Sequence, residues 1–302
     1  MKILVTGGLG FIGSHTAARL VAEGHDVSVL DNLHTGSRSS IAAAKVKAIE
    51  GDAGKIAGMK GKFEAVLHLG TYSSSPMYLE NPQLVARALA DWLAVLDYAR
   101  RNDSRLVFAS SSSLYNGNEP PHREGMPIAV TDFYTEARYA MERLAELYHS
   151  LYSLPSAGLR YFSVYGPGER PKGRYANPIS QFMWAMEAGE SPVLFGDGMQ
   201  TRDFIHVDDV VKANTLALGC MEHGIFNIGT GKAATFNRVV GLLNAELGTS
   251  IRPVYQPNRI RNYVAHTLAD TSLAERRLGF RSSVSLEDGV RRLVASERRR
   301  AG

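Results

Sequence analysis

The chain has 302 residues, of which 44% are hydrophobic and 21% are charged, and its formal net charge is +4. A chain of this length can bury a substantial core in one large domain or two, and its composition is ordinary for a globular enzyme. Much of the basic excess lies in the segment 291–300, and no Lys/Arg-rich run with interleaved aromatic residues occurs, so nucleic acid is not an expected partner.

The single cysteine, Cys220, rules out an internal disulfide and lies in an apolar run, where we expect a buried small hydrophobe. Because no C-x-x-C spacing occurs, no metal site is expected. No apolar run reaches the roughly 18 residues of a membrane span, and the first residues enter a strand without a basic leader. These features predict a reducing, cytoplasmic location without membrane contact.

Short β-rich runs alternate with helical patterns along the first half of the chain. The predicted strands are 3–7, 27–31, 46–51, 65–70, 105–111 and 156–162. Apolar residues at helical spacing cover 85–101 and 134–152. This alternation predicts an α/β fold with a Rossmann-like, doubly wound parallel sheet.

The pattern changes after Tyr165. Gly, Pro and charged residues crowd 166–178, which predicts a loop, and a helical pattern follows through 182–190. We expect a smaller, mixed α/β C-terminal substrate domain. The predicted coenzyme domain is 1–162 with a returning segment near 204–232, and the predicted substrate domain is 163–203 with 233–302.

Residues 6–13 (TGGLGFIG) join the first strand to a helix. Gly7, Gly10 and Gly13 let the backbone turn sharply and approach a pyrophosphate, whose charge then faces free helix N–H groups. Asp31 ends the second strand, about 20 residues on, where an acid accepts hydrogen bonds from an adenosine ribose. A carboxylate there repels a 2′-phosphate and favours NAD over NADP, although Arg38 is close enough in sequence to be a phosphate partner.

Polar residues at later strand ends could carry chemistry. Asp52 could reach an adenine amino group, or it could be an exposed turn residue. Serines at 110–113 follow the fifth strand, and Tyr134 and Arg138 share one helix face. A nearby cation would favour the phenolate form of Tyr134, which could take a proton from a sugar hydroxyl while hydride leaves the carbon. Spacing alone favours the plainer interpretation of a surface tyrosine and a helix-facing arginine.

Over nearly its whole length the chain resembles the extended short-chain dehydrogenases/reductases of the nucleotide-sugar epimerase/dehydratase group, in particular the UDP-glucose/UDP-galactose 4-epimerases. The matching blocks, in order, are TGGLGFIG, LDNLHTG, EGDA, HLGT, FASSSSLYN, LRYFSVYGPGERP, FGDGMQTRDFIHVDDV, FNIGTGK and HTLAD. The resemblance implies NAD as coenzyme, a nucleotide-diphosphate sugar (UDP-linked) as substrate, and a homodimer paired through the two long helices.

The resemblance also implies roles for individual residues. Tyr134 would be the catalytic base, with Ser111 and Arg138 beside it. The implied NAD-binding residues are Gly7, Gly10, Phe11, Ile12, Gly13, Asp31, Asn32, Asp52, Ala53, Leu69, Gly70, Thr71, Tyr134, Arg138 and, at the nicotinamide end, Tyr161. The implied substrate residues are Ser111, Ser163, Asn177, Arg202 and a second arginine, either Arg259 or Arg261.

The chain departs from the family pattern in four places, one of which is Asn116, where the family usually has Gly. Arg138 stands where the family has Lys; it keeps the charge but cannot easily lose a proton, so we expect Arg138→Lys to retain or improve activity. Ser163 replaces an Asn and is a shorter donor for the substrate. Ala88, Asp91 and Trp92 replace a family coenzyme motif, so that contact is expected to be absent or supplied otherwise.

The two residues after Ser111 indicate which reaction of the family to expect. Ser112 and Ser113 occupy the places where a related 4,6-dehydratase has an Asp-Glu pair and a decarboxylase has Glu. Without that second acid/base pair, the simplest reaction is 4-epimerisation through a 4-keto intermediate. The alternatives are a 4-reductase, a dehydratase, an epimerase of UDP-N-acetylhexosamine or UDP-uronic acid, and a catalytically inactive NAD-binding protein. The small Thr267 is expected to line the sugar pocket.

Overall fold

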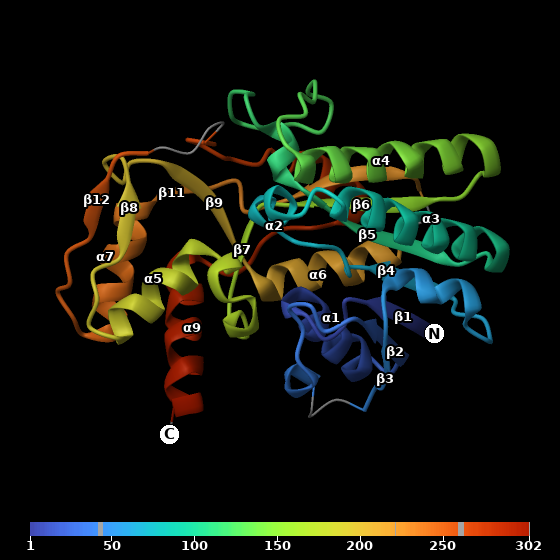
Figure 1. Ribbon diagram of the computed structural model, residues 1–302, viewed down its shortest axis with the longest axis horizontal. Helices are drawn as coiled ribbons and strands as arrows, with labels where there is room; N and C mark the ends of the chain where they lie inside the picture. The colour runs from blue at the N-terminus through green and yellow to red at the C-terminus, as the bar shows by residue number, and fades with distance from the viewer. Residues whose placement is uncertain (42–44, 221, 259–262, 302) are drawn as a thin grey trace.

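The computed structural model describes residues 1–41, 45–220, 222–258 and 263–301. Its core is a seven-stranded parallel sheet in the order β10-β6-β5-β4-β1-β2-β3 (Figure 1). The strands are β1 (Lys2–Thr6), β2 (Asp26–Asp31), β3 (Lys47–Glu50), β4 (Ala65–His68), β5 (Arg105–Ser111), β6 (Ser156–Tyr161) and β10 (Gly224–Ile228). The fold class predicted from the sequence is confirmed. Because the strands are parallel, their carboxyl ends meet at one edge, where such sheets bind ligands.

Helices cover both faces of this sheet. Alternate residues of β1 serve opposite layers: Ile3 and Val5 pack with α1 and α6, whereas Leu4 packs with α3. The helices on the first face are α1 (Phe11–Ala22), α6 (Val207–Leu218) and α8 (Ser272–Leu278); those on the second are α3 (Leu84–Asn102) and α4 (Phe133–Tyr152), with the 3-10 helix η2 (Ala53–Gly58) beside α3. Trp92 of α3 fixes the two long helices to each other, because its indole N–H donates to the Met141 carbonyl at 2.9 Å.

A smaller group of elements packs on its own apolar core. Its sheets are β11 (Ala233–Thr235), β9 (Thr201–His206) and β7 (Ser163–Tyr165), and β12 (Val254–Gln256) with β8 (Val193–Phe195). Its helices are α5 (Pro178–Glu187), α7 (Phe236–Leu247) and α9 (Leu286–Ala301). Meanwhile α6 and β10 return to the large sheet, β10 beside β6. The chain thus crosses between the two groups more than once, and the crossings flank the carboxyl edge of the large sheet (Figure 1).

Two expectations about local structure need correction. Cys220 is half-buried rather than buried, at the edge of the core under α6. The expected loop 166–178 contains a 3-10 helix, η4 (Arg170–Tyr175). The basic C-terminal segment belongs to α9, where Arg291 and Arg292 form ion pairs with Asp288 and Asp208. In the described part of the chain no helix is both long and apolar enough to cross a membrane.

Candidate active site

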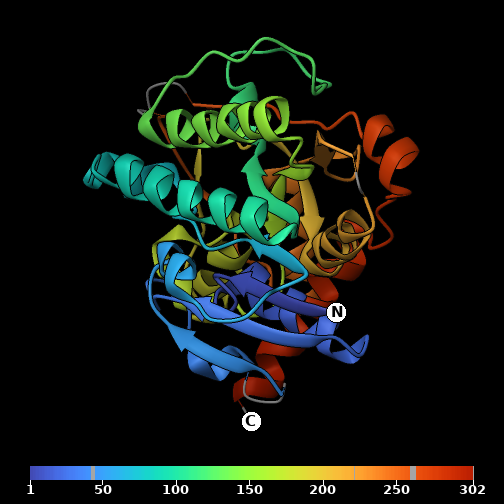
Figure 2. The same cartoon turned by 90° about the vertical axis from the view of Figure 1, so that its right-hand side faces the viewer.

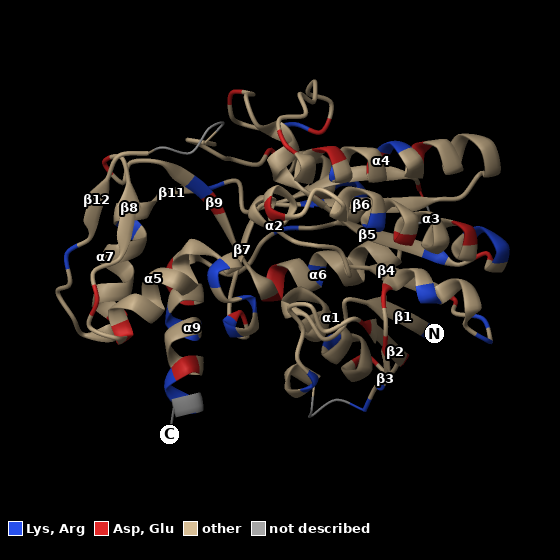
Figure 3. Ribbon diagram, in the orientation of Figure 1, with Lys and Arg blue, Asp and Glu red and all other residues tan. Residues whose placement is uncertain are grey.

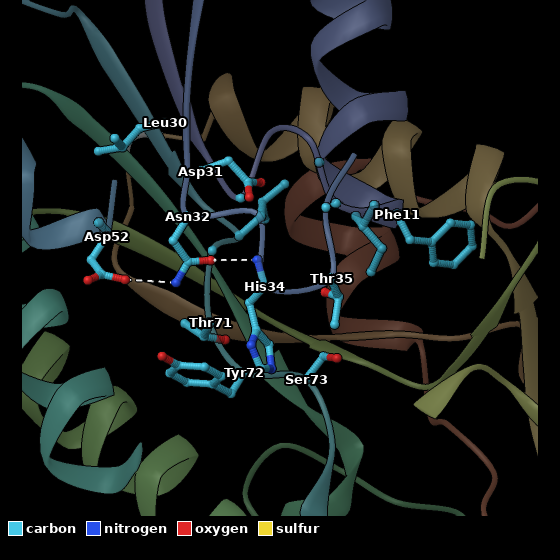
Figure 4. A pocket seen from close by; sticks show the side chains of 18 of the residues that line it. Phe11, Leu30, Asp31, Asn32, His34, Thr35, Asp52, Thr71, Tyr72 and Ser73 are labelled. Atoms are coloured by element: carbon cyan, nitrogen blue, oxygen red, sulfur yellow. Dashed lines mark hydrogen bonds between the residues drawn. The ribbon is translucent and has the colours of Figure 1, made fainter. Parts of the chain in front are cut away.

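A groove runs along the carboxyl ends of β1, β2 and β4 (Figure 4). The glycine turn forms one part of its wall, and Asp31, Asn32 and Asp52 form another. The coenzyme residues expected from the sequence that line it are Gly7, Gly10, Phe11, Ile12, Gly13, Asp31, Asn32, Asp52, Ala53, Leu69, Gly70 and Thr71. Segments far apart in the sequence therefore converge on one elongated site.

The turn after β1 can only be built from glycine. Gly7 has φ +67°, and a Cβ there would lie 2.5 Å from the Cα of Gly70. A Cβ on Gly13 would lie 2.0 Å from the carbonyl oxygen of Gly7. At the start of α1, Gly10 offers no side-chain cap and the first turn holds no acidic residue. The helix N-terminus is thus left open to an anionic ligand.

Asp31 is buried and already fixed by the backbone. Its Oδ2 accepts from the Leu9 N–H at 2.9 Å, and its Oδ1 accepts from the Leu33 N–H at 2.8 Å. A carboxylate has about four acceptor positions, so capacity remains for a ribose diol. Arg38 forms an ion pair with Glu50 at 2.8 Å, with its side chain 62% exposed, and it does not line the groove. This arrangement favours NAD over NADP as the coenzyme, because Arg38 is paired with Glu50 and does not line the groove.

Two further acids stand at the same end of the groove. The Asn32 side chain donates to Asp52 Oδ1 at 2.7 Å, which orients both groups (Figure 4). Asp91, on α3, accepts from the Gly54 N–H at 2.8 Å and also lines the groove. Burial raises the pKa of the Asp91 carboxyl. The altered family motif on this helix left the coenzyme contact either absent or supplied otherwise, and Asp91 is the residue of that motif that lines the groove.

Tyr134 lies in the first turn of α4. The turn is set by a capping box, in which Asp132 accepts from the Thr135 N–H at 2.8 Å. The Arg138 guanidinium lies 5.1 Å from the centroid of the Tyr134 ring. Tyr78 packs edge-on against Tyr134 at 5.6 Å between centroids. Burial raises the pKa of Tyr78 to about 12, so its phenol stays protonated.

Arg138 is itself anchored by its fork. Its two terminal nitrogens donate to the carbonyls of Ala109, in β5, and Tyr72, after β4, each at 2.9 Å. Its side chain is buried, so the charge stays beside Tyr134. A lysine has one nitrogen and no planar fork, and it would lose one of these bonds or move the charge. The earlier expectation that Arg138→Lys keeps full activity is therefore revised.

The serines of the segment 110–113 have two different structural roles. Ser111 ends β5 and caps the 3-10 helix η3 (Ser112–Tyr115), accepting from the Ser113 N–H at 3.1 Å. Ser110 donates to Glu142 Oε1 at 2.5 Å, beneath the site. Glu142 in turn receives two bonds from Arg160, of 2.9 and 2.6 Å, in a buried pair. The sequence analysis missed this pair, although a charged residue inside the strand pattern 156–162 was a signal for it.

The expected substrate residues gather near the start of the smaller group of elements. Asn177 caps α5 and donates to the Ser163 hydroxyl at 2.9 Å, so two of them touch. Arg202 lies between the rings of Phe236 and Tyr263, at 5.5 and 5.4 Å from their centroids, and burial lowers its pKa. Arg259 and Arg261 lie outside the described residues.

Two of the expected site residues form hydrogen bonds inside the fold. The Tyr161 hydroxyl donates to Asn214 Oδ1 at 2.6 Å in the core, and Tyr161 does not line the groove. Thr267 is buried, and its hydroxyl accepts from the Asp203 N–H at 3.2 Å. Both hydroxyls are engaged in internal hydrogen bonds, and the ligand contacts expected of these two residues stay predictions.

Comparison with known proteins decides the family. The sequence model described as the NAD dependent epimerase/dehydratase family matches residues 3–229. The chain belongs to this family. A UDP-glucose 4-epimerase of Mycolicibacterium smegmatis is 32% identical over 97% of each chain. The structure of a Thermotoga maritima UDP-glucose 4-epimerase with UDP-glucose superposes with a TM-score of 0.94, at 32% identity over 100% of each chain.

NAD is the coenzyme of this epimerase family, and the groove fits it. A Thermus thermophilus UDP-glucose 4-epimerase in complex with NAD superposes with a TM-score of 0.88, at 30% identity over 99% of each chain. Within the described residues, the buried Thr71 hydroxyl in the groove wall has no hydrogen-bond partner, and neither has the Tyr78 hydroxyl beside Tyr134. Buried polar atoms rarely remain unsatisfied, so the Thr71 hydroxyl marks a place in the groove wall that suits a polar ligand.

Proposed function

We propose that the protein is an NAD-dependent 4-epimerase of a nucleotide sugar, with a UDP-hexose such as UDP-glucose or UDP-galactose as its substrate. The observation that carries this proposal is the acid–base set at the end of β5 and the start of α4. It consists of the Tyr134 phenol with the fixed Arg138 charge and the Ser111 hydroxyl, followed by Ser112 and Ser113. Such a set can move one proton at one hydroxyl, and those two serines supply no carboxylate to expel water.

In the proposed reaction Tyr134 takes the proton of the sugar C4 hydroxyl, and Ser111 donates a hydrogen bond to the same oxygen. Arg138 holds a positive charge beside the reacting phenol, with its guanidinium 5.1 Å from the ring centroid. Bound NAD supplies a reversible hydride acceptor at C4. Tyr134 then returns the proton after the keto-sugar has rotated in the site. The product leaves with unchanged mass and with inverted configuration at C4.

The sugar must rotate while its nucleotide stays bound. Arg202, held between two aromatic rings, is suited to a diphosphate because its planar fork donates bidentate hydrogen bonds. We assign it that role, together with the touching pair Asn177 and Ser163. Arg259 or Arg261 remains our proposal for the second arginine. We propose the domain boundaries expected from the sequence for this division, with the coenzyme on one side of the site and the nucleotide on the other, except that α8 packs on the large sheet.

The test is product analysis in deuterated water. UDP-glucose, UDP-galactose, UDP-N-acetylglucosamine and UDP-glucuronate are incubated separately with the protein, and products are followed by mass and NMR. The proposal expects a C4 epimer of unchanged mass that carries no solvent deuterium at C4, because the hydrogen returns from the coenzyme. Loss of water identifies a dehydratase, and deuterium at C4 contradicts the hydride route. Absence of turnover with all four sugars, in protein that binds NAD, supports the inactive alternative.

We also propose that the protein is a homodimer. On α3 and α4, which lie side by side on the surface (Figure 2), Leu93, Leu147, Leu151 and Tyr152 are 39%, 50%, 67% and 50% exposed. Large apolar side chains gathered on adjoining helices favour burial against a partner. Light scattering of the wild-type chain and of Leu147→Glu/Leu151→Glu tests this, since the proposal expects twice the monomer mass only in the former.

A further inference from the structure

The groove has a marked imbalance of charge. Asp31, Asp52 and Asp91 line it as acids, and among the described residues that line it Lys172 is the one lysine or arginine. NAD brings a pyrophosphate with two negative charges to this groove. The glycine turn offers backbone N–H groups to those charges, yet it carries no cationic side chain of its own. A cationic side chain from elsewhere in the chain would therefore stabilise the bound pyrophosphate.

Lys172 comes from η4, in the segment that follows β7 and lies beside the start of α1 (Figures 1 and 3). Its ammonium lies 5.2 Å from the centroid of the Phe11 ring, and Phe11 is the first residue of α1. In this fold a pyrophosphate sits at the N-terminus of that helix. We infer that Lys172 binds the coenzyme pyrophosphate and that the segment 166–172 is a strap that carries this charge across the groove.

The strap is held at both ends. His15 of α1 and the Pro167 carbonyl oxygen are 3.0 Å apart, and burial lowers the pKa of His15, so the neutral ring donates this bond. At the other end the Lys172 ammonium donates at 2.7 Å to Oε1 of Glu169, a residue of the same strap that is itself bonded to Asn177 and Ser180. An ammonium has three donors, so this bond leaves two for phosphate oxygens.

Glu169 is the positioning residue of the strap. Its side chain is fully buried and also accepts from the Ser180 hydroxyl at 2.6 Å and from the Asn177 N–H at 3.0 Å. A carboxylate held by three donors is a rigid anchor, and it aims Lys172 at the groove. The same carboxylate touches Asn177, which we assign to the substrate. Coenzyme and substrate residues thus share one buried group.

The test measures coenzyme binding by the full-length protein and needs no sugar. We compare NAD⁺, ADP-ribose and adenosine by calorimetry or competition, because only the first two carry the pyrophosphate. Lys172→Met keeps an unbranched side chain of similar length and removes the charge. Losing a charged hydrogen bond predicts about tenfold to hundredfold weaker binding of NAD⁺ and ADP-ribose, with adenosine unchanged. The salt dependence of NAD⁺ binding should also weaken, and Lys172→Arg should restore most of the affinity.

Two further variants keep the test decisive. Lys212→Met removes a half-buried lysine on α6 that donates to the Arg281 carbonyl outside the groove, and it should leave all three affinities unchanged. Glu169→Gln/Lys172→Met removes both charges, so no unpaired carboxylate is buried; it should fold normally and still bind NAD⁺ weakly. The inference is overturned if this folded double variant binds ADP-ribose within twofold of wild type, or if adenosine weakens equally. Failure of the proposed epimerisation would appear separately, as intact NAD⁺ binding without a sugar product.

Discussion

The buried ion pair of Arg160 and Glu142 offers the sharpest test of what holds the catalytic helix in place. Arg160 lies on β6 and Glu142 on α4, and their side chains are 3% and 6% exposed. We expect Arg160→Met to lower the free energy of unfolding by about 3–5 kcal/mol, because it leaves a buried carboxylate without its counter-charge. Ser110 donates to the same carboxylate but supplies no positive charge.

The magnitude separates this pair from ordinary surface pairs. Arg19 pairs with Glu23 at 2.6 Å, yet its side chain is 60% exposed, so Arg19→Met should cost only about 0.3–0.5 kcal/mol. The double variant Glu142→Gln/Arg160→Met keeps an acceptor for Ser110 and removes both charges, so it should be more stable than Arg160→Met alone. Urea unfolding followed by circular dichroism measures all of these variants. A loss below about 1 kcal/mol in Arg160→Met, or a double variant no more stable than the single one, would refute the reasoning.

Further predictions address the chemistry and the coenzyme. Tyr134→Phe should lower the epimerisation rate by about 10²–10⁴-fold with NAD binding intact, and near-native turnover would remove Tyr134 as the base. Arg138→Lys should lower both turnover and stability, because one of two carbonyl bonds is lost; unchanged values would show that charge alone suffices. Asp31→Asn should weaken NAD binding about tenfold or more and reduce discrimination against NADP, and equal affinities of the variant and wild type would count against the ribose contact. Burial, with a smaller effect of Arg138, lowers the pKa of His68 from 6.5 to about 3. Between these pH values His68 is protonated in the unfolded chain but not in the folded one. The free energy of unfolding should therefore fall as the pH drops below 6.5. Wild type should lose about 2 kcal/mol more than His68→Asn between about pH 7.5 and about pH 5, and parallel pH profiles of unfolding would contradict this.

The sequence by itself determined the features that depend on residues close together along the chain. Alternating strand and helix patterns settled the parallel sheet, since apolar periodicity depends only on neighbouring residues. The glycine turn was equally readable, because Gly7 and Gly13 permit a backbone that a Cβ would block. Asp31 followed from its distance to that turn. The pairing of Tyr134 with Arg138 followed from helical spacing and is seen as a 5.1 Å contact.

Only the tertiary structure decided which distant residues share a site. Arg160 and Glu142 are 18 positions apart and Gly54 and Asp91 are 37 apart, and no periodicity links them. Lys172 belongs to a segment expected as a plain loop, and its place over the groove depends on how the strap packs against α1. Long-range contacts of this kind arise from the packing of whole elements, which fixes the position of each charge only after the chain has folded.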